Sequence, residues 1–290
     1  MPDTTRIDHN LPFDDYVAAP GINATALKAG INESPLAMHY RMTGDEEDRD
    51  TEEKHKGSLA HIAILEPEAF ASKVSVFPGP ITAKTRATNA YKDFAAEHEL
   101  PVLPDELPAL MELPGAVHAN RFAHDLLSRT EHEVSLFWHD SLYGQAKARL
   151  DGLDSRVGIV ELKTTTVWPR RVVRDDGTTE VDLFRLTRLA NGLNYHVQFG
   201  WYWLGASTFH GEQLPVHVVW VKQRKPFDVI VQRVPTPVLK EGADLAMRMA
   251  KYYRACEASG QFPGVCDDVV EYERPTWAKE EGWKVGEEDD

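Results

Sequence analysis

The sequence predicts an α/β fold in which a central mixed sheet is flanked by helices, with further helices added on the N-terminal side. Three observations predict it. Short β-rich segments follow one another between residues 133 and 165, a helical block occupies about 182–206, and two apolar strands come after it. Strands that connect to later strands through a crossover helix are typical of α/β proteins.

The first elements are predicted to be helices. Residues 22–43 indicate one helix, a break at Ser34-Pro35 and a second short helix. Residues 56–65 predict another helix, which Pro67 should close. A polar, helix-rich stretch at 86–130 is either an inserted subdomain or an arch over a site, and both interpretations stay open. It is expected to be interrupted at its prolines, Pro101, Pro104, Pro108 and Pro114.

The β-rich part begins at Glu133. Its strands are expected at 133–139, 143–151, 158–165, 216–222 and 227–234. Turn residues at 140–141 and 151–154 separate the first three, and 145–150 should pair with 158–164 as an antiparallel hairpin. A last helix is expected from about Pro237 to Glu257, because a proline suits its first turn and Gly260 follows its end.

These elements are expected to form one domain over residues 1–272, with a helix-rich part at 22–130 and a core at 131–272. Residues 273–290 are expected to be an acidic, disordered tail. The net charge is −14, but segments 45–53 and 280–290 carry 11 of those charges, so the body is nearly balanced. The charge therefore neither supports nor excludes a nucleic-acid partner.

Other sequence features limit the possible location of the chain. The longest strongly apolar stretch, 216–221, has the length of a strand, so no bilayer-spanning segment is expected. The first ten residues lack the basic start and apolar run of a signal peptide. Two cysteines, Cys256 and Cys266, are too few for a disulfide framework. The expected location is the cytoplasm, without membrane association.

Two carboxylates and a lysine form the candidate active site. On a strand at 158–165, Glu161 and Lys163 project from one face while Val160 and Leu162 project from the other. Asp151 ends the preceding strand, and a hairpin can return it to the same edge of the sheet. Two converging carboxylates are ligands that suit Mg²⁺, whose bound water Lys163 can orient or help to deprotonate.

The simpler interpretation of Glu161 and Lys163 is a surface ion pair on an edge strand. An acid-x-Lys triplet also occurs at Glu52-x-Lys54, so chance alone can supply one. The residues around the second triplet favour a site, because β-branched residues flank it and a run of threonines, 164–166, follows it.

The segment KARLDGLDSRVGIVELKTT resembles the core of the PD-(D/E)XK nucleases, in their RecB-like and exonuclease VIII (RecE-type) branch. In that branch an Asp ends one strand and an acid-x-Lys lies on the next. Further similar motifs occur in family order, and the resemblance spans about 22–272. They are ALKAGINESPLAMHYR, Gly57-Ser-Leu-Ala-His61 followed by IAILEPEAF, Glu133 in EVSLFW, Gln198-Phe-Gly-Trp-Tyr202, and YYRACEASGQFPG.

The resemblance implies a PD-(D/E)XK, restriction-endonuclease-like core and a role for each matched residue. Asp151, Glu161 and the Leu162 carbonyl would hold Mg²⁺, which Mn²⁺ can replace, and His61 would complete the metal's ligands. Lys163 would position the water, and Gln198 and Tyr202, four apart on one helix face, would steady the strand. Glu133 is a possible additional member. Alternatively, His61 is an ordinary helix histidine, and the aromatic stripe around Gln198 and Tyr202 is simply core.

Basic residues near this motif predict contacts with the phosphate backbone and no base-reading pattern. Lys147 and Arg149 alternate on the strand before Asp151, although a solvated strand face explains them equally well. The predicted DNA-contacting residues are Lys147, Arg149, Thr164, Arg170, Arg171, Arg174, Lys222, Arg224 and Lys225.

The implied activity is metal-dependent DNA exonuclease action, specifically 5′-to-3′ resection of linear duplex ends for recombination. The same resemblance implies a phage or prophage origin, a bacterial host cytoplasm, a single-strand annealing partner and a ring-shaped homo-oligomer. A single-strand or structure-selective nuclease of the same superfamily is the first alternative. A non-catalytic DNA-binding or assembly module that retains the fold is the second.

Overall fold

The computed structural model describes residues 5–44, 52–82 and 84–273. Its helices are α1 (Phe13–Ala18), α2 (Ala24–Asn32), α3 (Pro35–Thr43), α4 (Glu52–Leu65), α5 (Pro67–Lys73), the 3-10 helix η1 (Thr85–Ala87), α6 (Asn89–Glu97), α7 (Leu107–Ala119), α8 (Arg121–Arg129), α9 (Phe184–Gly192), α10 (Tyr195–His210) and α11 (Thr236–Ser259). Its strands are β1 (Arg6–Asp8), β2 (Val74–Val76), β3 (Leu100–Val102), β4 (Glu131–Asp140), β5 (Gly144–Asp154), β6 (Gly158–Thr165), β7 (Arg170–Val173), β8 (Thr179–Asp182), β9 (Val216–Lys222) and β10 (Val229–Arg233).

A mixed sheet with the strand order β1-β4-β5-β6-β9-β10 forms the centre of the fold. All neighbouring strands are antiparallel except β6 and β9, which are parallel. A parallel pair needs a crossover connection, and here the chain between β6 and β9 contains α9 and α10. The predicted α/β fold with a central mixed sheet is therefore confirmed.

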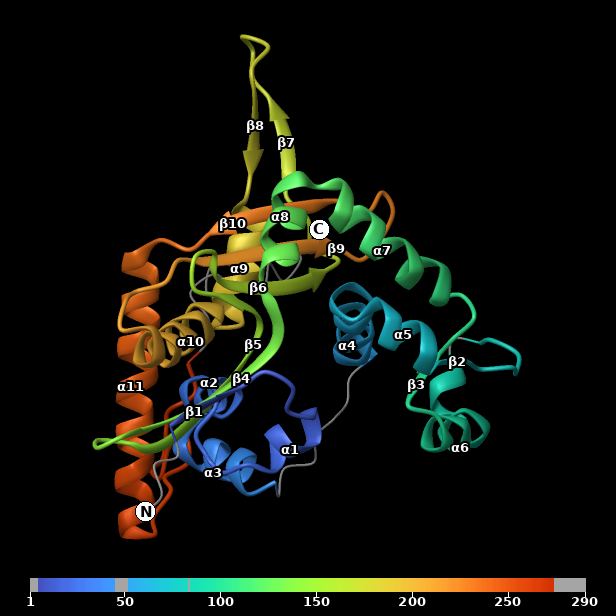
Figure 1. The fold of residues 1–290 in the computed structure, drawn as a ribbon. Helices are drawn as coiled ribbons and strands as arrows, with labels where there is room; N and C mark the ends of the chain where they lie inside the picture. Colours follow the sequence, from blue (N-terminus) through green and yellow to red (C-terminus); the bar gives the residue numbers. More distant parts are fainter. Residues whose placement is uncertain (1–4, 45–51, 83, 274–290) are drawn as a thin grey trace, which may run out of the picture.

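Each face of the sheet is covered by helices and has its own hydrophobic cluster (Figure 1). The first cluster joins the sheet to α2, α10 and α11, with Trp201 fully buried in it. The second joins the sheet to α4, α7 and α8. Alternation along β6 sends Val160 and Leu162 into the second cluster, as the sequence predicted.

Glycines allow α10 and α11 to pack closely. A Cβ at Gly200 would lie 2.2 Å from the Ala243 backbone nitrogen, and a Cβ at Gly242 would lie 1.9 Å from the His196 carbonyl oxygen. No side chain larger than hydrogen fits at either position. This close approach holds one face of α10 against α11, and the opposite face of α10 packs on the sheet.

The predicted Ser-Pro helix pair is confirmed as α2 and α3, with Ser34 capping α3 through a hydrogen bond from Ala37 N. The helix at 56–65 is confirmed within α4, and Pro67 begins α5 directly after it. The expected interruption at Pro114 is wrong, because α7 continues from Leu107 to Ala119. A continuous buried face on α7, made by Leu110, Leu113 and Val117, accounts for the helix continuing past the proline.

The expected turn at 151–154 is also wrong. Strand β5 continues to Asp154, and the turn follows at residues 155–157. Asp154 Oδ1 accepts hydrogen bonds from the backbone N–H groups of Arg156 and Val157, both at 2.8 Å, which is the arrangement of an Asx turn.

Strands β7 and β8 form an antiparallel hairpin that projects from the body, at the top of Figure 1. All eight of its strand residues are exposed. In the sequence, residues 170–174 indicate only a basic cluster, and neither this hairpin nor β1 and α1 was predicted. The predicted tail at 273–290 lies outside the described residues except for Glu273, and most of the acidic run at 45–53 also lies outside them.

Within the part of the chain that the structure describes, every helix is too short or too polar to serve as a membrane span.

Candidate active site

The candidate site lies where β5 and β6 diverge. The two strands form the predicted antiparallel hairpin, but they pair only near their turn, from Asp154↔Gly158 to Gly152↔Val160. The predicted pairing of residues 145–150 with 158–164 is therefore wrong. Beyond that point β5 takes a different partner, since the Ile22 N–H donates to the Gln145 carbonyl and the Ile22 carbonyl accepts from Lys147 N. Helix α10 packs at this fork, where Trp201 Nε1 donates to the Lys147 carbonyl.

Asp151 sits at the point of divergence. Its Oδ2 accepts a hydrogen bond of 2.7 Å from Leu162 N, which replaces the ladder bond that the separating strands no longer make. The carboxylate is thereby held beside β6, close to Glu161 and Lys163. The sequence prediction that Asp151 returns to the edge carrying Glu161 and Lys163 agrees with this position.

Glu161 is the most buried charged residue of the site, with 1% of its surface exposed. Its Oε1 accepts from Lys163 Nζ at 2.5 Å and from Gln198 Nε2 at 2.6 Å. Its Oε2 is buried and has no hydrogen-bond partner among the described residues. One oxygen of the carboxylate is therefore held by protein donors, and the other is free for a ligand.

The pKa values of Asp151 and Glu161 reflect the burial of these two carboxylates and the charges close to them. Burial raises the pKa of Asp151 to about 7; Lys163 opposes this rise and Glu133 adds to it. Burial, with the Asp151 charge, raises the pKa of Glu161 to about 7. Burial alone would lower the pKa of Lys163, but Glu161 and Asp151 outweigh it and raise the value, so Lys163 is an ammonium at neutral pH. A divalent cation would relieve the repulsion between the carboxylates.

His61 extends from α4 toward the same carboxylate. Its Nδ1 lies 3.8 Å from Asp151 Oδ1. Burial, together with the Lys163 charge, lowers the pKa of His61 to about 4. The ring is neutral at physiological pH, which is the form that binds metals.

Glu133 lies on β4 across from Asp151, between the pairs His132↔Gly152 and Val134↔Leu150. Its backbone has φ +55°, a value that non-glycine residues rarely adopt. Its Oε2 accepts from Arg149 Nε at 2.6 Å, so an arginine already neutralises this carboxylate. The structure thus places Glu133 next to the site with its own internal partner.

These residues fit a magnesium ion. The candidate donors are the free oxygen of Glu161 and the Asp151 carboxylate, with the His61 ring beside them. The Leu162 carbonyl, the other predicted ligand, belongs to the residue whose N–H binds Asp151. Within residues 5–44, 52–82 and 84–273, no three His, Cys, Asp or Glu side chains form a ready-made metal site. Mg²⁺ does not require such a cage, because it keeps several waters and takes one or two carboxylates plus a phosphate.

Gln198 and Tyr202 face the site from one side of α10, as their spacing predicted. Gln198, 8% exposed, donates to both Glu161 Oε1 and the Tyr202 hydroxyl, the latter at 3.1 Å. The surrounding aromatic residues Phe199, Trp201 and Trp203 belong to the core, which agrees with the simpler interpretation for them.

Two residues of the candidate site were not predicted from the sequence. Lys28 of α2 donates to Gln198 Oε1 at 3.1 Å, and burial and the Lys163 charge lower its pKa to about 8. Tyr195, the first residue of α10, has its ring 5.0 Å from Lys163 Nζ and 5.3 Å from Lys28 Nζ. No local pattern marks Lys28, because its partner Gln198 lies 170 residues away.

The predicted DNA-contacting residues divide into two groups. Lys147 is buried and donates to three backbone carbonyls at the end of α1, those of Tyr16, Val17 and Ala19. Arg149 bonds Glu133, Ser135 and the Leu11 carbonyl. The phosphate contacts predicted for Lys147 and Arg149 are not supported by these internal positions, nor is the alternative of a solvated strand face.

The other predicted contact residues lie at or near the surface. Arg170, Arg171 and Arg174 are exposed on the β7–β8 hairpin, where Arg174 pairs with Glu180. Arg224 and Lys225 are exposed after β9, and Lys225 pairs with Glu112. Lys222 is half-buried, as is Thr164, whose hydroxyl accepts from Gln223 Nε2 at 2.8 Å.

Comparison with known proteins supports the fold. The model of a family described as a PDDEXK-like domain of unknown function (DUF3799) matches residues 24–276. A crystal structure from Eubacterium rectale, provisionally described as an exonuclease, superposes with a TM-score of 0.57 at 14% sequence identity, covering 94% of this chain and 99% of that one. No curated protein matches the chain significantly. The predicted PD-(D/E)XK core is confirmed.

Proposed function

Because the chain belongs to the family of PDDEXK-like domains described above, we propose that it is a magnesium-dependent nuclease that hydrolyses phosphodiester bonds in DNA. One observation carries the proposal. At the fork between β5 and β6, Asp151 and Glu161 converge beside Lys163, and a buried oxygen of Glu161 has no protein partner among the described residues. Buried acidic residues with raised pKa values in such a cluster are typical of functional sites.

In this proposal Asp151, Glu161 and the Leu162 carbonyl hold the metal, and His61 completes its ligands. Bound magnesium supplies a water of lowered pKa and a positive charge beside the scissile phosphate. Lys163, as an ammonium, donates a hydrogen bond that orients the attacking water. Its raised pKa favours this orienting role over that of a general base.

Helix α10 prepares Glu161 for this task. Gln198 donates to the Glu161 oxygen that Lys163 also contacts, so the carboxylate cannot rotate freely and its other oxygen keeps its direction. Lys28 in turn holds the Gln198 carbonyl oxygen. Such preorganisation lowers the cost of forming the metal site when substrate arrives. Tyr202 is hydrogen-bonded to Gln198, and in this position it would steady the DNA strand.

The finer activity is exonucleolytic: 5′-to-3′ resection of linear duplex DNA, with Mn²⁺ able to replace Mg²⁺. The proposal also includes a phage or prophage origin, action in the bacterial host cytoplasm, a ring-shaped homo-oligomer and a single-strand annealing partner. The resemblance of the sequence motifs to the exonuclease VIII branch supports these details. The fold of the Eubacterium rectale protein, provisionally described as an exonuclease, is consistent with them.

Digestion of end-labelled linear, nicked and closed circular duplexes, with Mg²⁺ or with EDTA, tests the proposal. We expect Mg²⁺-dependent loss of the linear duplex, intact closed circles, and no cleavage by a Lys163→Ala variant that keeps its circular dichroism spectrum. The matched control is Lys251→Ala, which removes an exposed lysine from α11 and should retain full activity. Cleavage of closed circles would remove the exonuclease assignment, and full activity of Lys163→Ala would remove the proposed site.

A further inference from the structure

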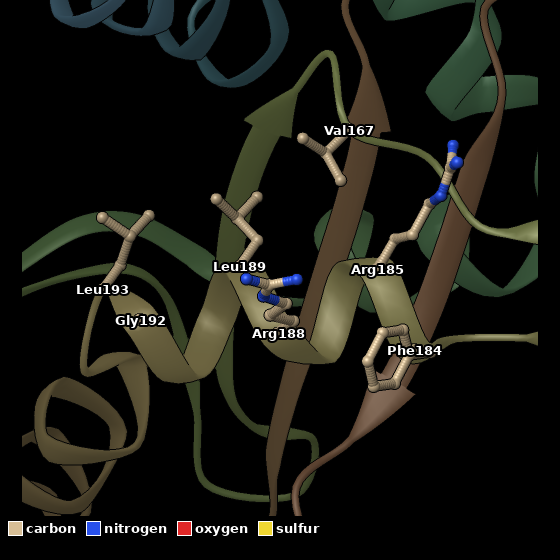
Figure 2. Close-up of a pocket in the computed structure, with 7 residues that line it drawn as sticks. All are labelled: Val167, Phe184, Arg185, Arg188, Leu189, Gly192 and Leu193. Atoms are coloured by element: carbon tan, nitrogen blue, oxygen red, sulfur yellow. The ribbon is translucent and has the colours of Figure 1, made fainter. Parts of the chain in front are cut away.

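A second feature lies beside the candidate active site, on α9. An open pocket of about 530 Å³ lies between this helix and the chain that follows β6 (Figure 2). Seven residues line it, and all are drawn in the figure: Val167, Phe184, Arg185, Arg188, Leu189, Gly192 and Leu193. None of the residues that have a proposed role in the active site lines this pocket.

The charge of the pocket is positive. Arg185 and Arg188 are three apart, so they lie on neighbouring positions of α9, and both are exposed. Neither pairs with a carboxylate of the described residues, whereas Arg149 and Arg174 do. In a chain of net charge −14, two adjacent arginines without acidic partners form a local site for an anion. A guanidinium binds phosphate well because its planar donors match two phosphate oxygens.

The rest of the lining is apolar, and two of its large side chains are exposed to solvent. Phe184 is 67% exposed and Leu193 is 43% exposed, although both are large hydrophobic side chains. Gly192 contributes no side chain, and a Cβ placed there would meet nothing within 4 Å. An aromatic face next to paired arginines is the combination with which proteins bind single-stranded nucleic acid, because bases stack on the ring while phosphates contact the charges.

Two lining residues of the pocket are close in the chain to residues of the candidate active site. Val167 comes four residues after Lys163, a separation of at most about 13 Å along an extended chain. Leu193 comes two residues before Tyr195, whose ring lies 5.0 Å from Lys163 Nζ. A DNA strand with one phosphate beside Lys163 therefore reaches the pocket within a few nucleotides.

We infer that the α9 pocket binds an unpaired segment of the DNA strand that is attached at the active site, with phosphates on Arg185 and Arg188 and a base or sugar against Phe184. This inference rests on the proposed nuclease function, which it extends by assigning the path of the strand. Binding is independent of sequence, because stacking and phosphate contacts occur with every base. The openness of the pocket suits a strand that passes through it, whereas a small molecule would favour an enclosed cavity.

The test measures binding of a fluorescently labelled oligothymidylate of about 12 nucleotides, within the usual site size of ~4–16. Fluorescence anisotropy is followed in EDTA, so that no cleavage occurs, between about 50 and 200 mM salt. The first variant is Arg185→Gln/Arg188→Gln. Its matched control, Arg248→Gln/Lys251→Gln, removes two exposed charges of the same spacing from α11.

Loss of two phosphate contacts should weaken binding and reduce the slope of log affinity against log salt by about 1.4, because each contact contributes ~0.7 on a single strand. The control pair should keep the wild-type slope. A second variant, Phe184→Ala, removes the aromatic ring without removing charge, and it should fold normally because this side chain is 67% exposed. It should bind about tenfold more weakly, since stacking of a base on an aromatic ring is worth that much.

Different failures have different consequences. If the wild-type chain does not bind the oligonucleotide, or if both variants bind it with wild-type affinity and slope, the inference is overturned. If the wild-type chain cleaves linear duplex while the variants bind normally, the nuclease function stands and only the α9 pocket is rejected. If the wild-type chain binds through α9 but cuts no DNA, the pocket stands and the proposed catalysis fails.

Discussion

Replacing Gly200 with alanine tests the close contact between α10 and α11 on which the candidate site depends. A Cβ at this position would lie 2.2 Å from Ala243 N and 2.5 Å from the Gly242 carbonyl carbon. Non-bonded heavy atoms normally stay about 3.5 Å apart or more, so the helices must separate by roughly 1 Å. Both obstructing atoms belong to the backbone, and therefore no side-chain rotation can relieve the contact.

The magnitude follows from two opposing effects. Overpacking costs up to about 3 kcal/mol, and alanine regains about 1 kcal/mol of helix propensity over glycine. The expected net loss of unfolding free energy for Gly200→Ala is about 2 kcal/mol, which corresponds to a melting temperature lower by roughly 4–8 °C. Because Gln198 lies two residues away on α10, DNA cleavage measured well below the melting temperature should fall as well.

Thermal unfolding followed by circular dichroism measures this change. The matched control is Gly115→Ala in α7, where a Cβ would meet nothing within 4 Å, so its stability should stay equal or rise. An unchanged or higher melting temperature for Gly200→Ala would refute the close packing of α10 on α11.

Three further substitutions test separate contacts. Gln198→Ala should lower kcat by at least about tenfold while the chain stays folded by circular dichroism, because Glu161 loses a charge-assisted donor. A wild-type kcat would remove Gln198 from the site. Asn120→Ala should lower the free energy of unfolding by about 1–2 kcal/mol, because it removes the N-cap of α8 and a hydrogen bond to a carbonyl of β10. Urea denaturation measures this change, and an unchanged free energy would contradict both contacts. Lys147→Met should release α1, seen as faster proteolysis at residues 13–20, and an unchanged rate would show that α1 is held by other contacts.

The strand periodicity of the sequence predicted which side chains lie together at the centre of the candidate site. Alternation on β6 placed Glu161 and Lys163 together and sent Leu162 to the core, which the structure confirms. Helices α2, α3 and α11 were also predictable, because Asn, Ser, Pro and Gly mark their ends locally. Local signals of this kind depend only on neighbours in the chain.

Features that depend on distant partners could not be predicted. Lys28 joins the site through Gln198, and Lys147 turns inward because the carbonyls of α1 lie above it. The β7–β8 hairpin escaped prediction because it is exposed on both faces, so no buried side alternates with a solvated one. The separation of β5 from β6 could not be predicted either, because it depends on Ile22, a residue distant in the sequence that replaces β6 as the partner of β5.

The central claim is that the fork between β5 and β6 is a metal-dependent catalytic site for DNA. The most direct measurement is single-turnover hydrolysis of an end-labelled linear duplex by the wild-type chain and by Glu161→Gln, each in Mg²⁺ and in EDTA. Glu161→Gln preserves the shape of the side chain and removes the charge that would bind the metal, while the buried oxygen of Glu161 has no other partner among the described residues. We predict hydrolysis only by the wild-type chain and only with Mg²⁺. Equal rates for the two proteins in Mg²⁺, or undiminished hydrolysis in EDTA, would contradict the claim.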